Sequence, residues 1–155
     1  MPGTDLFTIS IEGVSSEIRL LSFHGSEGMS QLFDYHVDLV SPDADIDFEE
    51  VIGKPALLTM ETDDAQRFVH GIVSRFEVTG SEEAQTHYGA TIVPSLWTLG
   101  LRQDSCIFQD MTTPEIIQDV LESAGMADGT DFEISAQGSF PAHEYCVQYR
   151  ETDFA

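Results

Sequence analysis

The sequence predicts a mainly β protein, with an antiparallel β-barrel followed by the start of an α+β module. Six extended segments follow one another before Pro94 and are joined by short loops, which is typical of an antiparallel barrel or sandwich. The strongest helix-start residues occur after Pro94. The length of 155 residues suits one domain or one and a fraction, with enough chain to bury a core. We therefore expect a barrel domain over residues 5–94 and a second module over residues 95–155.

The six predicted strands are marked by alternating apolar and polar residues or by runs rich in β-branched and aromatic residues. The clearest case is the segment 33–39, in which Phe33, Tyr35 and Val37 alternate with polar side chains. The predicted strands cover residues 6–11, 18–24, 33–39, 55–61, 67–79 and 86–93.

Loops and breaks separate these strands at recognisable residues. Pro42 and the acidic run 43–50 interrupt the sheet, and Asp47 can cap one short helical turn that Gly53 closes. Gly71 lies inside the long fifth strand and is a candidate β-bulge. Residues 80–85 are charged and are predicted to form a hairpin loop.

The second module is expected to mix one helix with short strands. Thr112, Pro114 and Glu115 combine a hydroxyl cap, a first-turn proline and an acid three residues after the cap, which together predict a helix start. Gly125 is predicted to end that helix. Its apolar stripe consists of Ile116, Ile117, Val120, Leu121 and Ala124. Further segments are a helical turn at 94–101 and extended pieces at 106–108, 132–135 and 144–149.

The last residues predict a strand that leads into a helix start. Thr152 and Asp153 are suited to the first turn of a helix, but only Phe154 and Ala155 follow. A helix needs about 8 residues to be worth starting. We therefore expect a chain cut inside its second module, with residues 152–155 frayed and the strand at 145–149 short of partners.

The charge excludes several partners. Six Lys and Arg stand against 28 Asp and Glu, a net charge of −22, and such a field repels nucleic acids and anionic membranes. The acidic surface either keeps the protein in solution, meets a basic partner or lines a lumen. No run of 18 apolar residues is present, so no stable membrane insertion is expected. The N-terminus lacks the pattern of a signal peptide, so we expect synthesis in the cytoplasm and export without a cleaved signal.

No catalytic, cofactor-binding or metal-binding residue is predicted. Cys106 and Cys146 stand 40 residues apart, which fits neither a disulfide framework nor a metal motif, and we expect both to be buried free thiols. His36 and His70 fall in predicted strands and are interpreted as hydrogen-bonded core residues. No nucleophile elbow, phosphate loop or dinucleotide motif occurs. The chain is therefore not predicted to be an enzyme, although a small β-barrel enzyme or ligand-binding module stays an alternative.

Several motifs in order along the chain resemble one family, the VgrG (valine-glycine-repeat) spike proteins of type VI secretion systems, also known as Rhs-associated Vgr proteins. The closing stretch EYCVQYRETDFA, residues 144–155, is the most specific match. The resemblance covers about residue 7 to Ala155. The other matching stretches are residues 28–33, 52–56, 68–73, 94–99, 107–110 and the helix 113–121.

The resemblance implies a structural protein with a mechanical role. The N-terminal region of this family resembles the hub of contractile phage tails and contains two related β-barrels, so that a trimer presents a pseudo-sixfold ring to the hexameric Hcp tube. An OB-fold and a β-prism spike follow, and effector or adaptor proteins ride on the spike, which leaves the cell through the type VI machine. Residues 5–94 would be the first hub-like barrel. The alternative is the hub or baseplate protein of a related contractile phage tail or extracellular injection particle.

Overall fold

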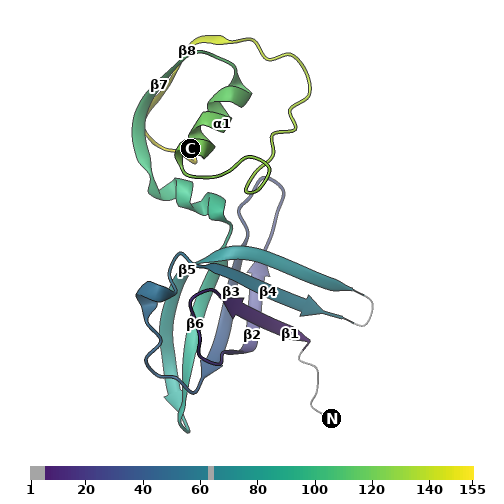
Figure 1. Ribbon diagram of the computed structural model, residues 1–155, viewed down its shortest axis with the longest axis vertical. Helices are drawn as coiled ribbons and strands as arrows, with labels where there is room; N and C mark the ends of the chain where they lie inside the picture. Colours follow the sequence, from purple (N-terminus) through teal and green to yellow (C-terminus); the bar gives the residue numbers. More distant parts are fainter. Residues whose placement is uncertain (1–5, 63–64) are drawn as a thin grey trace. The chain divides into compact units, whose positions relative to one another are not determined.

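The computed structural model describes residues 6–62 and 65–155. The chain divides into two compact units, Met1–Pro94 and Ser95–Ala155, called unit 1 and unit 2 below. In unit 1 a six-stranded antiparallel sheet has the order β1-β4-β5-β6-β3-β2 (Figure 1). Its strands are β1 (Phe7–Ile11), β2 (Arg19–Ser26), β3 (Asp34–Ser41), β4 (Pro55–Glu61), β5 (Gln66–Glu82) and β6 (Gln85–Val93).

The sheet of unit 1 is curled into a half-barrel. Its two edge strands, β1 and β2, are not hydrogen-bonded neighbours, yet the rings of Phe7 and Phe23 meet edge to face with centroids 5.2 Å apart. The long strand β5 pairs with both β4 and β6, and its register shifts at two places, between Val73 and Arg75 and between Val78 and Gly80. Such bulges increase local twist and bend, which lets a sheet curl. The prediction of a mainly β fold with an antiparallel barrel is confirmed, and the barrel takes the form of a half-barrel.

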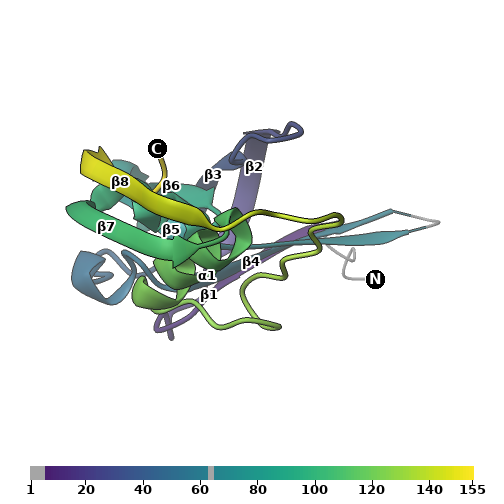
Figure 2. The same ribbon diagram turned by 90° about the horizontal axis from the view of Figure 1, so that it is seen from above.

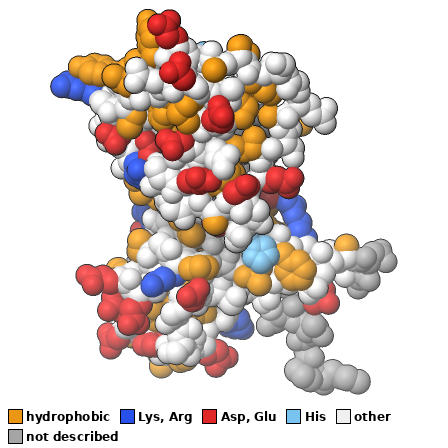
Figure 3. Space-filling model, turned by 45° about the horizontal axis from the view of Figure 1, so that its top comes forward, with side chains coloured by type: hydrophobic (Ala, Val, Ile, Leu, Met, Phe, Trp, Pro, Cys, Tyr) orange, Lys and Arg blue, Asp and Glu red, His pale blue; other side chains and the backbone are white. Residues whose placement is uncertain are grey.

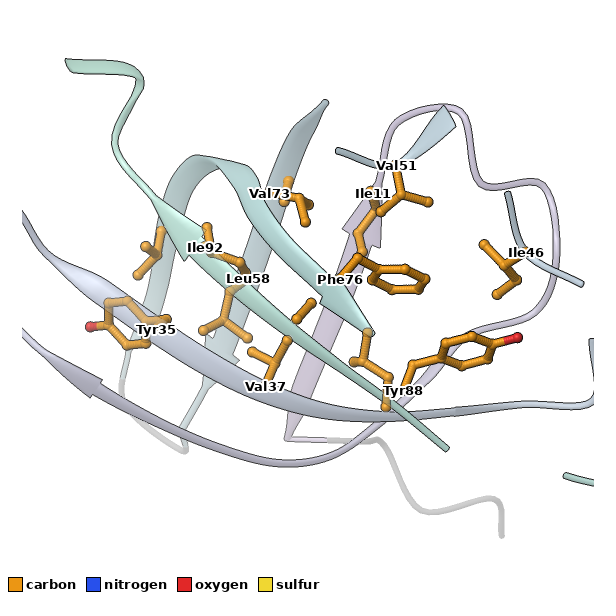
Figure 4. Packing of buried hydrophobic residues seen from close by; sticks show 14 residues of the cluster. Ile11, Tyr35, Val37, Ile46, Val51, Leu58, Val73, Phe76, Tyr88 and Ile92 are labelled. Atoms are coloured by element: carbon orange, nitrogen blue, oxygen red, sulfur yellow. The ribbon is translucent and has the colours of Figure 1, made fainter. Parts of the chain in front are cut away.

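The core of unit 1 lies inside the curl of the sheet. Figure 4 shows the buried side chains pointing toward one another from opposite strands. The rings of Phe76 and Tyr88 stack with centroids 5.1 Å apart, and the Tyr88 hydroxyl donates to the carbonyl of Asp43 at 2.8 Å. The fully buried members include Leu39, Leu58, Val51, Val73 and Ile92. Alternation in the sequence located this core because every second residue of a strand faces the same side.

The short turn at the end of the acidic run forms as predicted. It is a 3₁₀ helix, η1 (Phe48–Glu50), and the side chain of Asp47 accepts from the backbone N–H of Glu49 at 2.9 Å. Gly53 ends the turn and donates its N–H to the carbonyl of Val73 at 2.8 Å. This bond ties the turn, and with it the connection between β3 and β4, to β5.

The prediction of a bulge at Gly71 is wrong, because Gly71 pairs in regular register with Ala56. The glycine is needed for close approach instead. A Cβ built at Gly71 would lie 2.5 Å from the carbonyl oxygen of Val93, and 2.7 Å from a methyl group of Ile92. No side chain fits there, which is the other reason for a glycine inside a strand.

The predicted hairpin loop at 80–85 is shorter than expected. β5 runs to Glu82 and β6 begins at Gln85, with those two residues paired. The two-residue connection places Glu83 and Ala84 at φ values of 47° and 65°. Two positive φ angles are typical of the type I′ turn that suits the twist of a hairpin, although neither residue is the usual Asn or Gly.

Unit 2 holds a two-stranded antiparallel sheet and one α-helix. Its elements are the 3₁₀ helix η2 (Ser95–Leu101), β7 (Gln103–Met111), α1 (Thr113–Ser123) and β8 (His143–Thr152). β7 and β8 lie side by side along their length (Figure 2). The predicted strand at 144–149 is confirmed and extends to Thr152. The extended piece at 106–108 is part of the nine-residue β7.

The predicted strand at 132–135 is wrong. Within that segment the structure shows only an isolated bridge between Asp128 and Phe132. Alternation alone cannot make a strand, since an extended segment needs a neighbour to satisfy its backbone groups. Here β7 and β8 pair with each other, and their sheet does not include this segment.

Helix α1 begins and ends as predicted. The carboxylate of Glu115 accepts from the backbone N–H of Thr112 at 2.7 Å and from its hydroxyl at 2.8 Å. These two hydrogen bonds, the backbone one first, lower the pKa of Glu115. At the other end Gly125 has a φ of +86° and donates to the carbonyl of Glu122, while Met126 donates to that of Leu121. A left-handed glycine with such a pair of bonds is a common helix stop.

Candidate interaction surfaces

The two cysteines do not lie where the sequence predicted. Both are free thiols, but Cys106 is half-buried and Cys146 is exposed, so the prediction of buried thiols is wrong. Cys106 lies opposite Gln148 and Cys146 opposite Phe108 in the β7–β8 register, which places both thiols on one face of the two-stranded sheet. Burial raises the pKa of Cys106, and neighbouring carboxylates, Asp104 foremost, raise it further. A raised pKa makes a thiol a poorer nucleophile.

The histidines of the sheet are also not core residues. His36 and His70 are both exposed, which contradicts their interpretation as core side chains. The ring of His36 stacks on that of His24 with centroids 4.7 Å apart, and its Nδ1 lies 3.0 Å from the hydroxyl of Thr91. Within residues 6–62 and 65–155, no cluster of three His, Cys, Asp or Glu side chains is arranged to hold a metal ion.

An ion-pair cluster on unit 1 is centred on Glu27. The carboxylate of Glu27 accepts from the hydroxyl of Tyr35 at 2.7 Å and pairs with the guanidinium of Arg67. The hydrogen bond from Tyr35, and then that from Arg67, lower the pKa of Glu27. Burial and the bond to Glu27 raise the pKa of Tyr35. The cluster joins the chain after β2 to strands β3 and β5 of the sheet.

An apolar hollow lies in unit 2, and we call it the groove. Its volume is about 470 Å³. Helix α1 forms one wall, η2 and β7 contribute further apolar side chains, and the end of the chain from Glu151 to Ala155 forms the rim. Its apolar lining includes Leu96, Leu99, Phe108, Ile116, Ile117, Val120, Leu121, Phe132, Cys146 and Phe154.

The groove is open to solvent because unit 2 buries little of its apolar surface. Between residues 95 and 155 only Leu99 and Leu121 are buried. Ile117 is 47% exposed and Phe154 is 48% exposed, although both line the groove. The helix stripe that the sequence predicted as ordinary core packing is therefore only partly covered.

A polar anchor lies at the rim of the groove. The side chain of Asp153 is 5% exposed, and its Oδ1 accepts from the side-chain amide of Gln148 at 2.9 Å. Nε of Arg102 lies 3.2 Å from Asp153 Oδ2, but neither Asp153 Oδ2 nor Arg102 Nη1 has a partner in hydrogen-bond geometry, and both atoms are buried. Buried polar atoms without partners are rare and call for an explanation.

The end of the chain is bonded rather than frayed. The backbone N–H of Asp153 donates to the carbonyl of Arg102 at 3.1 Å, and that of Ala155 donates to the carbonyl of Thr152 at 3.0 Å. These bonds contradict the expected fraying of residues 152–155. They hold Phe154 and Ala155 against the groove.

The opposite face of the β7–β8 sheet is apolar and exposed as well, and we call it the outer face. Ile107 is 68% exposed, and Tyr145 and Tyr149 are each 65% exposed. The register places Ile107 opposite Val147, which is 50% exposed, so these side chains share one face. The guanidinium of Arg150 lies 5.4 Å from the Tyr149 ring centroid. Exposed contiguous apolar surface of this kind indicates an interaction site.

The charge around these apolar surfaces is strongly acidic. Residues 95–155 contain eleven Asp and Glu, two Arg and no Lys. Figure 3 shows hydrophobic side chains among many acidic ones and few basic ones on the visible face of the molecule. Both arginines of unit 2 already lie beside partners, Arg102 at Asp153 and Arg150 over Tyr149. A partner with basic residues would be favoured on this surface.

None of the helices in the described residues is long and apolar enough to cross a membrane.

Comparison with known proteins gives the chain a clear set of relatives. The sequence profile of the phage tail baseplate hub (GPD) family matches residues 26–155. The type VI secretion system spike protein VgrG5 of Pseudomonas aeruginosa is 38% identical over 150 residues, which cover 96% of this chain and 19% of that protein. VgrG1a of the same organism is 38% identical over 138 residues, or 88% of this chain and 21% of that protein.

Two further relatives complete the comparison. The actin cross-linking toxin VgrG1 of Vibrio cholerae is 34% identical over 159 residues, which cover 95% of this chain and 14% of the toxin. A solved structure of the E. coli c3393 protein, described as a type VI secretion component similar to the T4 bacteriophage tail proteins gp27 and gp5, superposes with a TM-score of 0.87. Its sequence identity is 27%, over 95% of this chain and 40% of that one. The chain thus spans about a fifth of the length of its first curated relatives.

Proposed function

Because the chain belongs to the phage tail baseplate hub family and is homologous to the VgrG spike proteins of type VI secretion systems, we propose that it is the N-terminal hub region of such a spike. The observation that carries this proposal is the superposition on the c3393 protein over 95% of the chain with a TM-score of 0.87. At 27% identity the likeness extends to sequence as well as to fold.

In the proposed assembly, three chains form a ring that docks on the Hcp tube hexamer. Residues 5–94 are the first hub-like barrel, and residues 95–155 open a second module that continues in the longer protein. Two barrels in each of three chains would give six similar surfaces, so that a threefold spike could match a sixfold tube. The curled sheet of unit 1 supports this proposal, since a sheet curled around its own core suits a part that transmits force.

We propose a mechanical role without catalysis for this region. The P. aeruginosa relatives are named as spike proteins, and the V. cholerae relative carries the name of a toxin. This chain aligns with 14% of that toxin, so the shared part is a small portion of it. Effector or adaptor proteins would ride on other parts of the spike. Export would then proceed through the type VI machine rather than through a cleaved signal.

A binding experiment tests the docking proposal. The full spike that contains this chain should retain purified Hcp hexamers in a pull-down, and sedimentation should give the mass of a trimer. The acidic charge predicts that both interactions depend on salt, so they are measured at low and moderate ionic strength. A spike that stays monomeric and retains no Hcp under either condition would overturn the proposal.

A second candidate is the hub of a related contractile phage tail or extracellular injection particle. The family whose profile matches this chain is described as a phage tail baseplate hub, and this description favours the second candidate. A tube protein from such a particle, used beside Hcp in the same pull-down, separates the two candidates. Selective retention of Hcp supports the type VI spike, and selective retention of the other tube protein supports the alternative.

A further inference from the structure

Two histidines face each other across the outermost strand pair of unit 1. His24 on β2 and His36 on β3 are direct partners in the antiparallel register, and both are exposed. β2 is an edge strand of the sheet and lies beside β3 (Figure 1). The two imidazole rings stack with centroids 4.7 Å apart and planes 24° apart. Neither side chain belongs to the core cluster of unit 1, so core packing does not account for the pair.

We propose that His24 and His36 bind one divalent transition-metal ion on the surface of unit 1, with Asp34 as a third ligand. Imidazole nitrogen suits Zn²⁺, Cu²⁺ and Ni²⁺, whereas Mg²⁺ and Ca²⁺ prefer oxygen ligands. Residues directly opposite on antiparallel strands have Cβ atoms about 4.5–5.5 Å apart, so two imidazoles in these positions can reach the same ion. The site lies wholly within unit 1, so the outcome of the Hcp pull-down does not bear on it.

The contacts of His36 indicate which of its nitrogens binds. Nδ1 lies 3.0 Å from the hydroxyl of Thr91, and Nε2 lies 3.1 Å from Oδ2 of Asp34. Two neighbouring ligands held by one zinc ion are about 3.0–3.4 Å apart, so Nε2 and Oδ2 already have the spacing of such a pair. The buried Thr91 can accept the Nδ1–H, which leaves the lone pair of Nε2 for the ion. Histidine ligands are commonly oriented in this way by a hydrogen bond from their other nitrogen.

His24 has to turn its ring to complete the site. As the side chains of residues 6–62 and 65–155 stand, no three such groups are arranged around one point, because the ring of His24 lies against the face of the His36 ring. Rotation about χ2 of histidine is soft, and the exposed side chain can turn without disturbing the core. The turn brings a nitrogen of His24 toward Nε2 of His36.

The charge around the pair favours a cation. Asp38 follows His36 by two residues on β3 and therefore lies on the same face, where its carboxylate accepts a hydrogen bond from the hydroxyl of Ser22 on β2. The net charge of −22 also raises the local concentration of cations.

A bound ion would fasten the edge strand β2 to β3. His24 and His36 are 12 residues apart in the sequence and come together only when the two strands pair. The ion would therefore bind the folded state in preference to the unfolded chain and would stabilise it.

Calorimetric titration of this chain with Zn²⁺, without a polyhistidine tag, tests the site. An excess of Mg²⁺ in the buffer occupies carboxylate groups that bind cations without imidazole. We expect one equivalent of Zn²⁺ to bind, and His24→Gln and His36→Gln each to weaken binding at least about 10-fold. Asp34→Asn should weaken it by a smaller factor. His70→Gln is the matched control, because His70 is also an exposed histidine in a strand of the same sheet, and it should leave binding unchanged.

Nuclear magnetic resonance of the unsubstituted chain locates the ion without relying on any variant. Zn²⁺ should shift the imidazole signals of His24 and His36 and leave those of His70 and His143 in place. The midpoint of thermal unfolding should rise with Zn²⁺ in the unsubstituted chain and not in His24→Gln. Absence of saturable binding in the presence of Mg²⁺ would overturn the proposal. An equal loss of affinity in His70→Gln, or imidazole shifts confined to other histidines, would also overturn it.

Discussion

Unit 1 and unit 2 contain similar kinds of residues but cover their apolar surfaces very differently. Among the described residues, sixteen of the buried hydrophobic side chains belong to unit 1 and two, Leu99 and Leu121, to unit 2. Unit 1 curls one sheet around its own core, whereas unit 2 packs one helix near a two-stranded sheet and leaves both sheet faces partly open. A two-stranded sheet with so little cover is marginal in water. The comparison teaches that the same chain can bury a full core in one unit and leave most apolar side chains of the other unit exposed.

The largest expected effect comes from removing core volume in the unit that has a core. Leu58→Ala in β4 removes a side chain with no exposure, which should lower the free energy of unfolding by about 3 kcal/mol. Ile117→Ala on α1, at 47% exposure, should cost less than about 1 kcal/mol. Urea unfolding followed by circular dichroism measures the change in the free energy of unfolding for Leu58→Ala.

The same titration can show whether the two units unfold separately. Trp97, the single tryptophan, lies in η2 and reports on unit 2 by its fluorescence. We expect its transition at lower urea than the transition seen by circular dichroism, which is dominated by the sheet of unit 1. Coincident transitions would mean that the two units unfold together as one cooperative block, and would contradict the expected difference in their stability.

A glycine pair on β5 tests how tightly unit 1 is packed. Gly71→Ala places a Cβ 2.5 Å from the carbonyl oxygen of Val93 and should destabilise the protein by about 1–3 kcal/mol. Gly80→Ala on the same strand meets nothing within 4 Å and should change stability by less than about 0.5 kcal/mol. Thermal unfolding of both variants checks this. Equal effects would show that close approach at Gly71 is not what selects the glycine.

The smallest effect concerns the ion pair of Glu27, whose side chain is 40% exposed. Its pKa is lowered in the folded state, so its contribution is present above the ordinary glutamate pKa of about 4.3 and is lost as the pH falls through the lowered value. Glu27→Gln should therefore cost about 0.5 kcal/mol at pH 7 and progressively less below about pH 4. Urea unfolding at several pH values measures the difference, with Glu82→Gln as the exposed control. A cost that grows on acidification would contradict the sign.

Much of unit 1 was predictable because alternation fixes which side of a strand faces the core. The segment with Tyr35, Val37 and Leu39 is a strand with those three side chains buried, as expected. The reason for Gly71 was not predictable, since the carbonyl of Val93, 22 residues further along the chain, approaches it from strand β6. His36 was misassigned because membership of a strand does not say which face a residue occupies.

Unit 2 was less predictable because its burial depends on tertiary cover. The caps of α1 are local signals, and both Thr112 and Gly125 act as the sequence indicates. Cys146 was expected to be buried from its residue type, but it borders an open groove. Residues 132–135 alternate like a strand yet join no sheet. No pattern in the sequence predicted the groove itself, although the apolar stripe of α1 forms one of its walls.

Native-state hydrogen exchange tests the contrast between the two units most directly. In this 155-residue chain, the amides of β3 and β6 should exchange only by global unfolding, while those of α1, β7 and β8 should exchange at least about 100-fold faster. Equal protection of both units in the 155-residue chain would contradict the account.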